Sequence, residues 1–337
     1  MAIPSVDLSD LTLLPPLTNA HDHLELNHYP RTKFREVYPN AHIWGEEVSA
    51  RLDNEPFHSL RAVPLADRLF IGGLKNLLCG ALIVVHHNPP HRDLYARDYP
   101  VRVVRRYRWA HSLHFSPPDV IHRIYRQCRR WHIPFYIHVG EGTDAVAAGE
   151  LGQLADLLGR DLSEVVLIHG VGLREADIKI WASRVRGLVI CPTTNRYLLD
   201  ALPHVRAWIA AGGRIALGSD SRLTADGDLL DELHAARQWF GELPNDAEAI
   251  TGAKPFSNDR IAVRGGVPLY AAQRSDLALV MRSGVPMIGD PPIMARFRRT
   301  QTVPALLDGV PKAIEAGLAR RILRCSLHEP GLELEFR

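Results

Sequence analysis

Regular alternation of short apolar segments with longer amphipathic segments is the feature that most limits how this chain can fold. IPFYIHV (133–139), VVLIHG (165–170), GLVICP (187–192) and RIALGSD (214–220) are apolar runs rich in β-branched residues. Segments with helical periodicity, such as READIKIWASRV and GDLLDELHAARQWF, follow these runs. Nearly continuous apolar strands that alternate with amphipathic helices predict a parallel sheet covered by helices on both faces.

Three further apolar segments extend this pattern toward the N-terminus. They are the segment that ends at NAHDH (19–23), GALIVVHHN (80–88) and VRVVRRYRW (101–109). Seven predicted strands favour an α/β fold of the (β/α)8 barrel type, in which an eighth strand completes the ring. The missing strand should lie between residues 88 and 135, so we expect a barrel that is either distorted or short of one strand.

The alternation stops after about residue 258, which predicts a change of architecture. RSDLALVMRSGVPMIGD (274–290) is typical of a two-stranded hairpin. We expect residues 1–16 and 263–298 to form a small, sandwich-like β element, residues 17–262 to form the barrel, and residues 299–337 to form a C-terminal helical segment. The insert at 28–78 is expected to act as a lid over the ligand.

Charge and cysteine content exclude some classes of protein. The formal net charge of +2 is too small to indicate binding to nucleic acid or membranes. Four scattered cysteines without a CxxC pair predict reduced, buried thiols and a cytoplasmic location. The longest apolar run, LLCGALIVV, is too short to span a bilayer, and we expect neither a signal peptide nor a membrane partner.

Polar side chains gather where the predicted strands end. His21 and His23 are two residues apart in a strand and therefore point to the same side. His138, His169 and Asp220 each stand at the end of a later strand, and the ends of parallel barrel strands form one rim. Imidazoles with a carboxylate suit zinc or ferrous iron. One coordination position would remain for water, which predicts a catalytic metal site.

The ordered motifs resemble the metal-dependent amidohydrolase superfamily, in particular its branch of cytosine and guanine deaminases, chlorohydrolases and adenosylhomocysteine deaminases. Members share HxH after the first strand, HxxE after the fifth, His after the sixth and Asp after the eighth. CPTTNRYL (191–198) is similar to the CPxSNxxL of this branch, and VVHHNP (84–89) matches a segment after its second strand. The resemblance covers most of residues 15–290.

The resemblance implies a site with one divalent ion, zinc or alternatively iron. Its implied ligands are His21, His23, His138 and Asp220. His169 would lie beside the metal and hydrogen-bond the developing oxyanion. Glu141 would shuttle a proton to the ring nitrogen and then to the leaving group, while Asp220 would accept a proton from the attacking water.

Residues that contact the substrate are implied less directly. RWAHSLHFSPPDVI (108–121) resembles the segment after the fourth strand, in which a histidine contacts substrate, and His111 is the matching position. His86 and Trp109 are further candidates for the pocket wall. A small heterocyclic molecule is the expected partner, and a homodimer is expected by analogy with the family.

Two enzymatic functions and two binding functions remain open at this stage. The sequence favours deamination of an amino-substituted heterocycle, such as a nucleobase or nucleoside. The alternative is ring opening of a cyclic amide, as in imidazolonepropionase. VRVVRRYRWAHSLH and HRIYRQCRRWH mix arginine with aromatic residues, as single-stranded nucleic-acid surfaces do, although no nucleic-acid partner is expected. A shortened barrel could also bind a ligand without catalysis.

Overall fold

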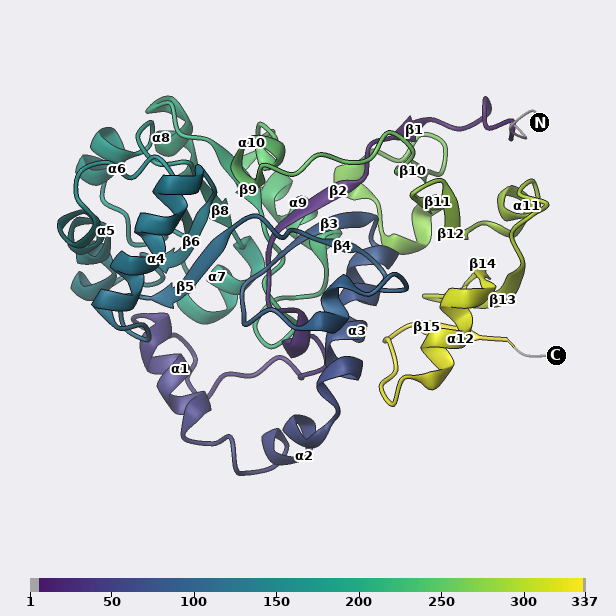
Figure 1. Cartoon of the computed structure of the whole chain (residues 1–337), viewed down its shortest axis with the longest axis horizontal. Helices are drawn as coiled ribbons and strands as arrows, with labels where there is room; N and C mark the ends of the chain where they lie inside the picture. The colour runs from purple at the N-terminus through teal and green to yellow at the C-terminus, as the bar shows by residue number, and fades with distance from the viewer. Residues whose placement is uncertain (1–5, 336–337) are drawn as a thin grey trace.

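Eight short parallel strands form a barrel within residues 6–335, the part of the chain that the computed structural model describes (Figure 1). In chain order the barrel strands are β2 (Leu17–Asp22), β3 (Ala81–His86), β4 (Arg102–Val103), β5 (Arg108–Ser112), β6 (Phe135–Val139), β7 (Val165–His169), β8 (Gly187–Ile190) and β9 (Ile215–Leu217). The predicted α/β barrel class is therefore confirmed.

Hydrogen-bonded pairing joins these strands in two groups, β2–β3–β4 and β5–β6–β7–β8–β9, so two seams complete the ring. At the seam between β9 and β2, the Asp220 amide donates to the His21 carbonyl at 3.0 Å, and the Ser219 amide donates to Asn19 Oδ1 at 3.0 Å. Next to the other seam, the Tyr107 hydroxyl donates to a backbone carbonyl at the end of β3. The β9–β2 seam matters most for function because predicted site residues stand on both sides of it.

The stretch VRVVRRYRW, which the sequence predicts as one strand, contains two. β4 ends at Val103 and β5 begins at Arg108, with exposed Arg105 and Arg106 between them. Consecutive parallel strands usually need a crossover of about a dozen residues, and only residues 104–107 separate this pair. The eighth strand lies within residues 88–135, where the sequence analysis expected it, and the alternative of a barrel short of one strand is wrong for the described residues.

Helices surround the barrel and extend one side of it. They are α1 (Ala41–Ser49), α2 (Phe57–Ala62), α3 (Leu65–Leu78), α4 (Pro118–Trp131), α5 (Ala145–Leu158), α6 (Glu175–Trp181), α7 (Pro192–Leu199), α8 (Val205–Ala210), α9 (Leu229–Phe240) and α10 (Ala247–Thr251), with 3-10 turns η1 (Leu24–Leu26) and η2 (Arg92–Tyr95). α4 shows why the periodicity is predictive, because Ile121, Tyr125 and Cys128 bury one face against the barrel while its arginines face outward.

A seven-stranded antiparallel sheet lies beside the barrel, on the right of Figure 1. Its order is β1 (Leu13–Leu14), β10 (Arg260–Val263), β11 (Leu277–Arg282), β12 (Val285–Gly289), β14 (Val310–Glu315), β13 (Thr302–Leu307) and β15 (Leu332–Leu334). The remaining elements are η3 (Leu269–Ala271), η4 (Arg274–Asp276), α11 (Pro291–Met294) and α12 (Ala316–Arg324). The hairpin predicted at 274–290 is confirmed as β11 and β12.

The C-terminal segment is not wholly helical, which corrects the sequence prediction for 299–337. β13 and β14 form a hairpin, and the helix α12 begins only at Ala316. Asp308 and Gly309 make its turn with φ of 52° and 76°, the backbone that an Asp-Gly hairpin turn requires. The division of the chain into domains at the stated boundaries stays a prediction.

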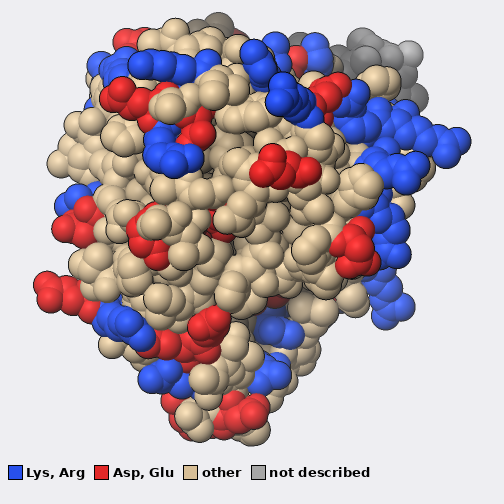
Figure 2. Space-filling view, turned by 90° about the vertical axis from the view of Figure 1, so that its left-hand side faces the viewer, with Lys and Arg blue, Asp and Glu red and all other residues tan. Residues whose placement is uncertain are grey.

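The surface bears on the remaining sequence hypotheses. Basic and acidic side chains both occur across the face shown in Figure 2. Tyr107 and Tyr125, two aromatic residues of the arginine-rich stretches, are buried and cannot stack on a ligand from solvent. The four cysteines are buried and unpaired, as predicted. Within residues 6–335 no helix combines the length and apolar character needed to cross a membrane.

Candidate active site

The predicted site residues converge at the carboxyl ends of the barrel strands. His21 lies in β2 and His23 follows it, His138 lies in β6, His169 ends β7, and Asp220 follows β9. Two overlapping groups offer ligand atoms within 4.8 Å of one another, namely His21 with His138 and His169, and His21 with His23 and Asp220. All five residues are buried. Their assignment as ligands stays a prediction, but the fold brings them together.

The donor atoms form two metal-sized groups that share His21: His138 falls in the group with His169, and His23 and Asp220 fall in the other. Two ligands with bonds of about 2.0–2.1 Å in tetrahedral geometry stand roughly 3.3 Å apart. The Nε2 atoms of His21 and His138 are 3.3 Å apart. Asp220 Oδ1 is 3.6 Å from His23 Nε2 and 3.8 Å from His21 Nε2. Imidazole nitrogens with one carboxylate oxygen are a donor set that zinc and ferrous iron accept.

Hydrogen bonds at the far side of two rings set which nitrogen faces the centre. His138 Nδ1 lies 2.7 Å from the His111 carbonyl, which can only accept a hydrogen bond, so Nδ1 carries the proton and Nε2 keeps a free lone pair. Asn195 Nδ2 lies 3.0 Å from His169 Nδ1. With the amide in this orientation Nδ1 accepts, so Nε2 of His169 carries the proton. His169 is thereby set up as a hydrogen-bond donor, the role implied by the family resemblance.

Burial favours the neutral form of His21, His138 and His169, and the neutral imidazole is the form that ligates a metal. The pKa values of His21 and His138 are held well below the usual range. Desolvation is the largest cause, and the neighbouring imidazole rings lower these pKa values further. Burial also lowers the pKa of His169 to about 4. His21, His138 and His169 therefore favour the uncharged form, and His138 presents a lone pair at Nε2.

Two of the site residues have left-handed backbone conformations. His169 has φ of 74° and Asp220 has φ of 50°, in the region that non-glycine residues rarely occupy. Such conformations cost of order 1–3 kcal/mol each and persist only where the surrounding structure enforces them. His169 is the last residue of β7 and Asp220 follows β9 by three residues, so both turns place a side chain on the barrel rim.

Glu141 is placed to exchange protons with a bound molecule. Its Oε1 lies 3.4 Å from His169 Nε2, and its side chain lines the pocket above the cluster. Burial, and then the nearby carboxylates of Asp220 and Glu150, raise the pKa of Glu141 well above its ordinary value. A buried carboxyl group with a raised pKa suits general acid–base catalysis.

A pocket of about 520 Å3 opens above these groups. One end is polar and contains His138, His169, Glu141 and Asp220, with Ser221 beside them. The other end is apolar and is built mainly by the 28–78 insert. Its lining residues are Leu26, Tyr29, Trp44, Val48, Leu52, Phe57 and Leu223. The insert therefore forms a wall of the pocket, while its movement as a lid stays a prediction.

The helix α1 is fastened to the loop that carries Glu141. The Ala41 amide donates to the Glu141 carbonyl at 2.9 Å. His42 Nε2 lies 3.1 Å from Glu150 Oε1, and the other oxygen of this buried carboxylate accepts from the Gly140 amide at 2.6 Å. These contacts place His42 and Glu150 in the pocket wall, and no sequence motif marked either residue.

The predicted substrate contacts have different outcomes. His111 and Trp109 line the pocket, so contact with a substrate remains a prediction for both. His86 does not line it, because its ring is buried and its Nδ1 accepts from the Leu24 amide at 3.3 Å. Neighbouring residues at a strand end point to opposite sides, and it is His87 that faces the cluster, with its ring centroid 4.9 Å from that of His21. The structure therefore does not support a substrate-binding role for His86.

Sequence relatives of the chain are deaminases. No protein-family model matches it. A 5-methylthioadenosine/S-adenosylhomocysteine deaminase of Natronomonas pharaonis is 30% identical over 185 residues, which are 50% of this chain and 42% of the relative. A protein of the same name from Desulforudis audaxviator is 27% identical over 275 residues, 69% of this chain and 62% of the relative. The chain thus matches less than two thirds of the length of either curated relative.

Solved structures show the same fold at low sequence identity. An adenosine deaminase from Xanthomonas campestris with bound zinc has a TM-score of 0.61 and 16% identity, covering 82% of this chain and 80% of that one. An atrazine chlorohydrolase from Arthrobacter aurescens complexed with zinc has a TM-score of 0.63 and 16% identity, covering 82% of this chain and 83% of that one. These two matches show that the chain shares its fold with these solved structures.

Proposed function

We propose that the chain is a metal-dependent amidohydrolase and that it deaminates an uncharged, amino-substituted heterocycle, in keeping with the name of its sequence relatives. Water adds to the ring carbon that bears the amino group, a C–N bond breaks, and the products are the oxo-heterocycle and ammonia. One observation carries the proposal. Glu141, with its raised pKa, lines the same pocket as His23, His138, His169 and Asp220, and His21 lies buried against these groups.

Different residues of this chain would bind the metal, transfer protons and stabilise the developing negative charge in such a reaction. A divalent metal held by His21, His23, His138 and Asp220 would supply water of lowered pKa at neutral pH. Glu141, protonated before the reaction, gives its proton to the ring nitrogen and thereby makes the ring carbon electrophilic. Asp220 takes a proton from the attacking water, and this proton is passed on, with the help of Glu141, to the amino group, which leaves as ammonia. His169 donates a hydrogen bond to the oxygen that gains negative charge.

The pocket lining indicates which heterocycles fit. Among the described residues that line it there is neither lysine nor arginine, whereas Glu141, Glu150 and Asp220 are carboxylates. Apart from the proposed metal, a phosphate or carboxylate on the substrate would find no lysine or arginine to pair with in this lining. The apolar end suits an uncharged substituent. Of the two substrates in the relatives' name, 5-methylthioadenosine fits this description better than the zwitterionic S-adenosylhomocysteine.

Ammonia release from the zinc- or iron-loaded protein tests the proposal, with Glu141→Gln as the matched blank. We expect the wild type to deaminate neutral nucleosides such as 5-methylthioadenosine and adenosine, and to be at least 100-fold slower on adenosine 5′-monophosphate. Glu141→Gln should keep its metal and lose at least 99% of turnover, because the amide cannot supply the proton.

Three outcomes would change the proposal. Full activity of Glu141→Gln would remove this residue from the mechanism. Equal rates on the nucleoside and its monophosphate would contradict the substrate class. No ammonia from any amino-substituted purine, pyrimidine, pterin or triazine would move the assignment to ring opening of imidazolones and hydantoins. Zinc is proposed as the native ion, and the metal content of the protein as purified tests that choice.

A further inference from the structure

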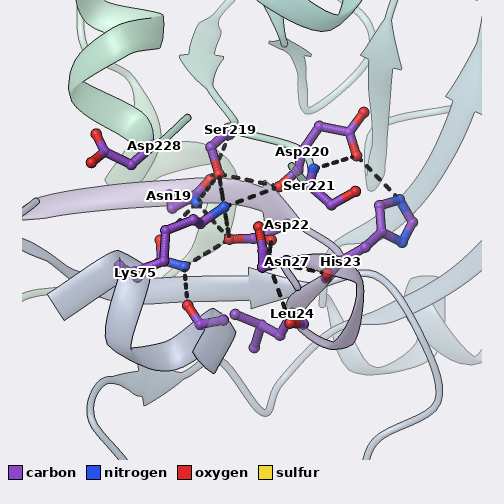
Figure 3. A network of polar contacts seen from close by, with 12 residues as sticks. Asn19, Asp22, His23, Leu24, Asn27, Lys75, Ser219, Asp220, Ser221 and Asp228 are labelled. Atoms are coloured by element: carbon purple, nitrogen blue, oxygen red, sulfur yellow. Dashed lines mark hydrogen bonds and ion pairs between the residues drawn. The ribbon is translucent and has the colours of Figure 1, made fainter. Parts of the chain in front are cut away.

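A fully buried lysine lies directly beneath the residue cluster. Lys75 comes from α3, and its side chain is 0% exposed. Its ammonium is 3.0 Å from Asp22 Oδ2, 3.0 Å from Ser219 Oγ and 3.4 Å from the Asp220 carbonyl. An ammonium has three N–H donors, and three acceptors surround this one. Figure 3 shows Lys75 between the strand that carries Asp22 and the turn that carries Ser219 and Asp220.

Asp22 is the residue between the two predicted ligands His21 and His23. By strand alternation its side chain points away from them, out of the barrel and toward α3. Besides Lys75 it is bound by three amides. Asn76 Nδ2 donates to Oδ2 at 2.7 Å, Asn19 Nδ2 donates to Oδ2 at 3.2 Å, and Asn27 Nδ2 donates to Oδ1 at 2.8 Å. This carboxylate is therefore held in one position.

Lys75 and Asn19 also bind the residues that follow β9, on the other side of the β9–β2 seam. Ser219 Oγ accepts from Asn19 Nδ2 at 2.7 Å, and Lys75 donates to the carbonyl of Asp220 itself. Strand pairing is interrupted at this seam, so the ladder alone does not fix the two turns relative to each other. One cation contacts both turns, and these turns carry His21, His23 and Asp220.

We infer that Lys75 is a positioning residue for the metal centre, acting through Asp22 on one turn and through Ser219 and the Asp220 carbonyl on the other. The inference rests on the metal centre of the proposed function. Outer residues that orient ligands typically change metal affinity by about 10- to 100-fold when they are removed. Lys75 needs no contact with substrate for this role.

Metal affinity of Lys75→Met, measured by competition with a chelator, tests the inference. We expect the dissociation constant for zinc to rise by about 10- to 100-fold. Cobalt at saturating concentration should also give an altered visible absorption spectrum, because the ligand geometry changes. Lys312→Met is the matched control. Lys312 is likewise buried and bonded to a carboxylate and a carbonyl, Asp290 Oδ1 and Leu277 O at 2.7 Å each, but it belongs to the antiparallel sheet.

The control separates positioning from stability. Lys312→Met should lower the melting temperature while its zinc affinity stays within twofold of the wild type and its cobalt spectrum is unchanged. If Lys75→Met binds zinc within twofold of the wild type, or if Lys312→Met weakens zinc as much, the positioning role is wrong. If the wild type itself binds no divalent metal, the proposed function fails instead.

A double variant keeps the test decisive if Lys75→Met does not fold. Asp22→Asn combined with Lys75→Met removes both charges, so no unpaired ion is left buried. We expect this variant to fold and still to bind zinc at least tenfold more weakly, because the Asp220 carbonyl has lost its donor. Affinity equal to the wild type in the double variant would overturn the inference.

Discussion

Gly218→Ala should damage folding and metal binding together, because Gly218, the residue after β9, packs directly against His21 of β2. A Cβ at this position would lie 2.6 Å from His21 Cβ and 3.0 Å from both the nitrogen and the oxygen of His21. Ordinary contact begins near 3.4 Å, so the seam must open by about 0.8 Å, the difference between 3.4 and 2.6 Å. Overpacking of this kind costs roughly 1–3 kcal/mol of unfolding free energy.

Opening the seam by this distance would also separate the proposed metal ligands on its two sides. His21 Nε2 and Asp220 Oδ1 are 3.8 Å apart, and an added 0.8 Å gives about 4.6 Å. Two bonds of 2.2 Å span only about 4.4 Å even in a straight line. One of the two ligands must therefore leave or the strands must distort further, and we expect the dissociation constant for zinc to rise at least tenfold.

Urea denaturation and chelator competition measure the two effects, with Gly152→Ala as the control. Gly152 lies in α5 with no atom within 4 Å of an added Cβ. The control should gain about 0.5–1 kcal/mol, since alanine is the better helix former, and keep its zinc affinity. If Gly218→Ala unfolds at the wild-type urea concentration and binds zinc within twofold of the wild type, the close approach at the seam is not required.

Two further predictions concern buried carboxylates. Glu329→Gln should lower the unfolding free energy by about 3–5 kcal/mol, because Arg222 and Arg274 both donate to this fully buried carboxylate; a loss below about 1 kcal/mol in urea denaturation would contradict this. Glu232→Gln should flatten the pH dependence of stability. Burial raises the pKa of Glu232 from 4.5 to about 8, so the folded protein keeps a proton that the unfolded chain loses, and stability falls as pH rises between these values. Equal slopes of melting temperature against pH in both proteins would refute this reasoning.

Much of the barrel was predictable because periodicity and strand ends are local properties of the sequence. Each of the four apolar runs from 133 to 220 contains a strand, and the helices between them carry the expected buried faces. The strand pair within 101–109 was not predictable in this way. β4 is only two residues long and its connection contains no helix, so nothing in the periodicity separates it from β5. The hairpin at 302–315 had a local signal, the Asp-Gly pair, which the helical pattern of the following residues obscured.

The candidate site was predictable to the extent that its members follow strands. His21, His138, His169 and Asp220 meet at one rim because parallel strands bring their carboxyl ends together. Which of His86 and His87 faces the pocket depends on which of them points into the barrel at the end of β3. Two adjacent histidines in the sequence do not reveal this orientation. Lys75 was hidden for a different reason. A single lysine in an amphipathic helix is usually solvated, and only the tertiary structure shows three acceptors around it.

The interrupted seam between β9 and β2 also determines when, during folding, the metal site becomes complete. His21 and Asp220 are 199 positions apart (220 minus 21), so a nascent chain has its first two imidazoles long before the carboxylate that completes their group. Closing so long a loop is slow, and the metal binds strongly only after it has closed. The appearance of the cobalt spectrum during refolding should therefore coincide with the last folding phase. Metal uptake would then report when the barrel ring is complete.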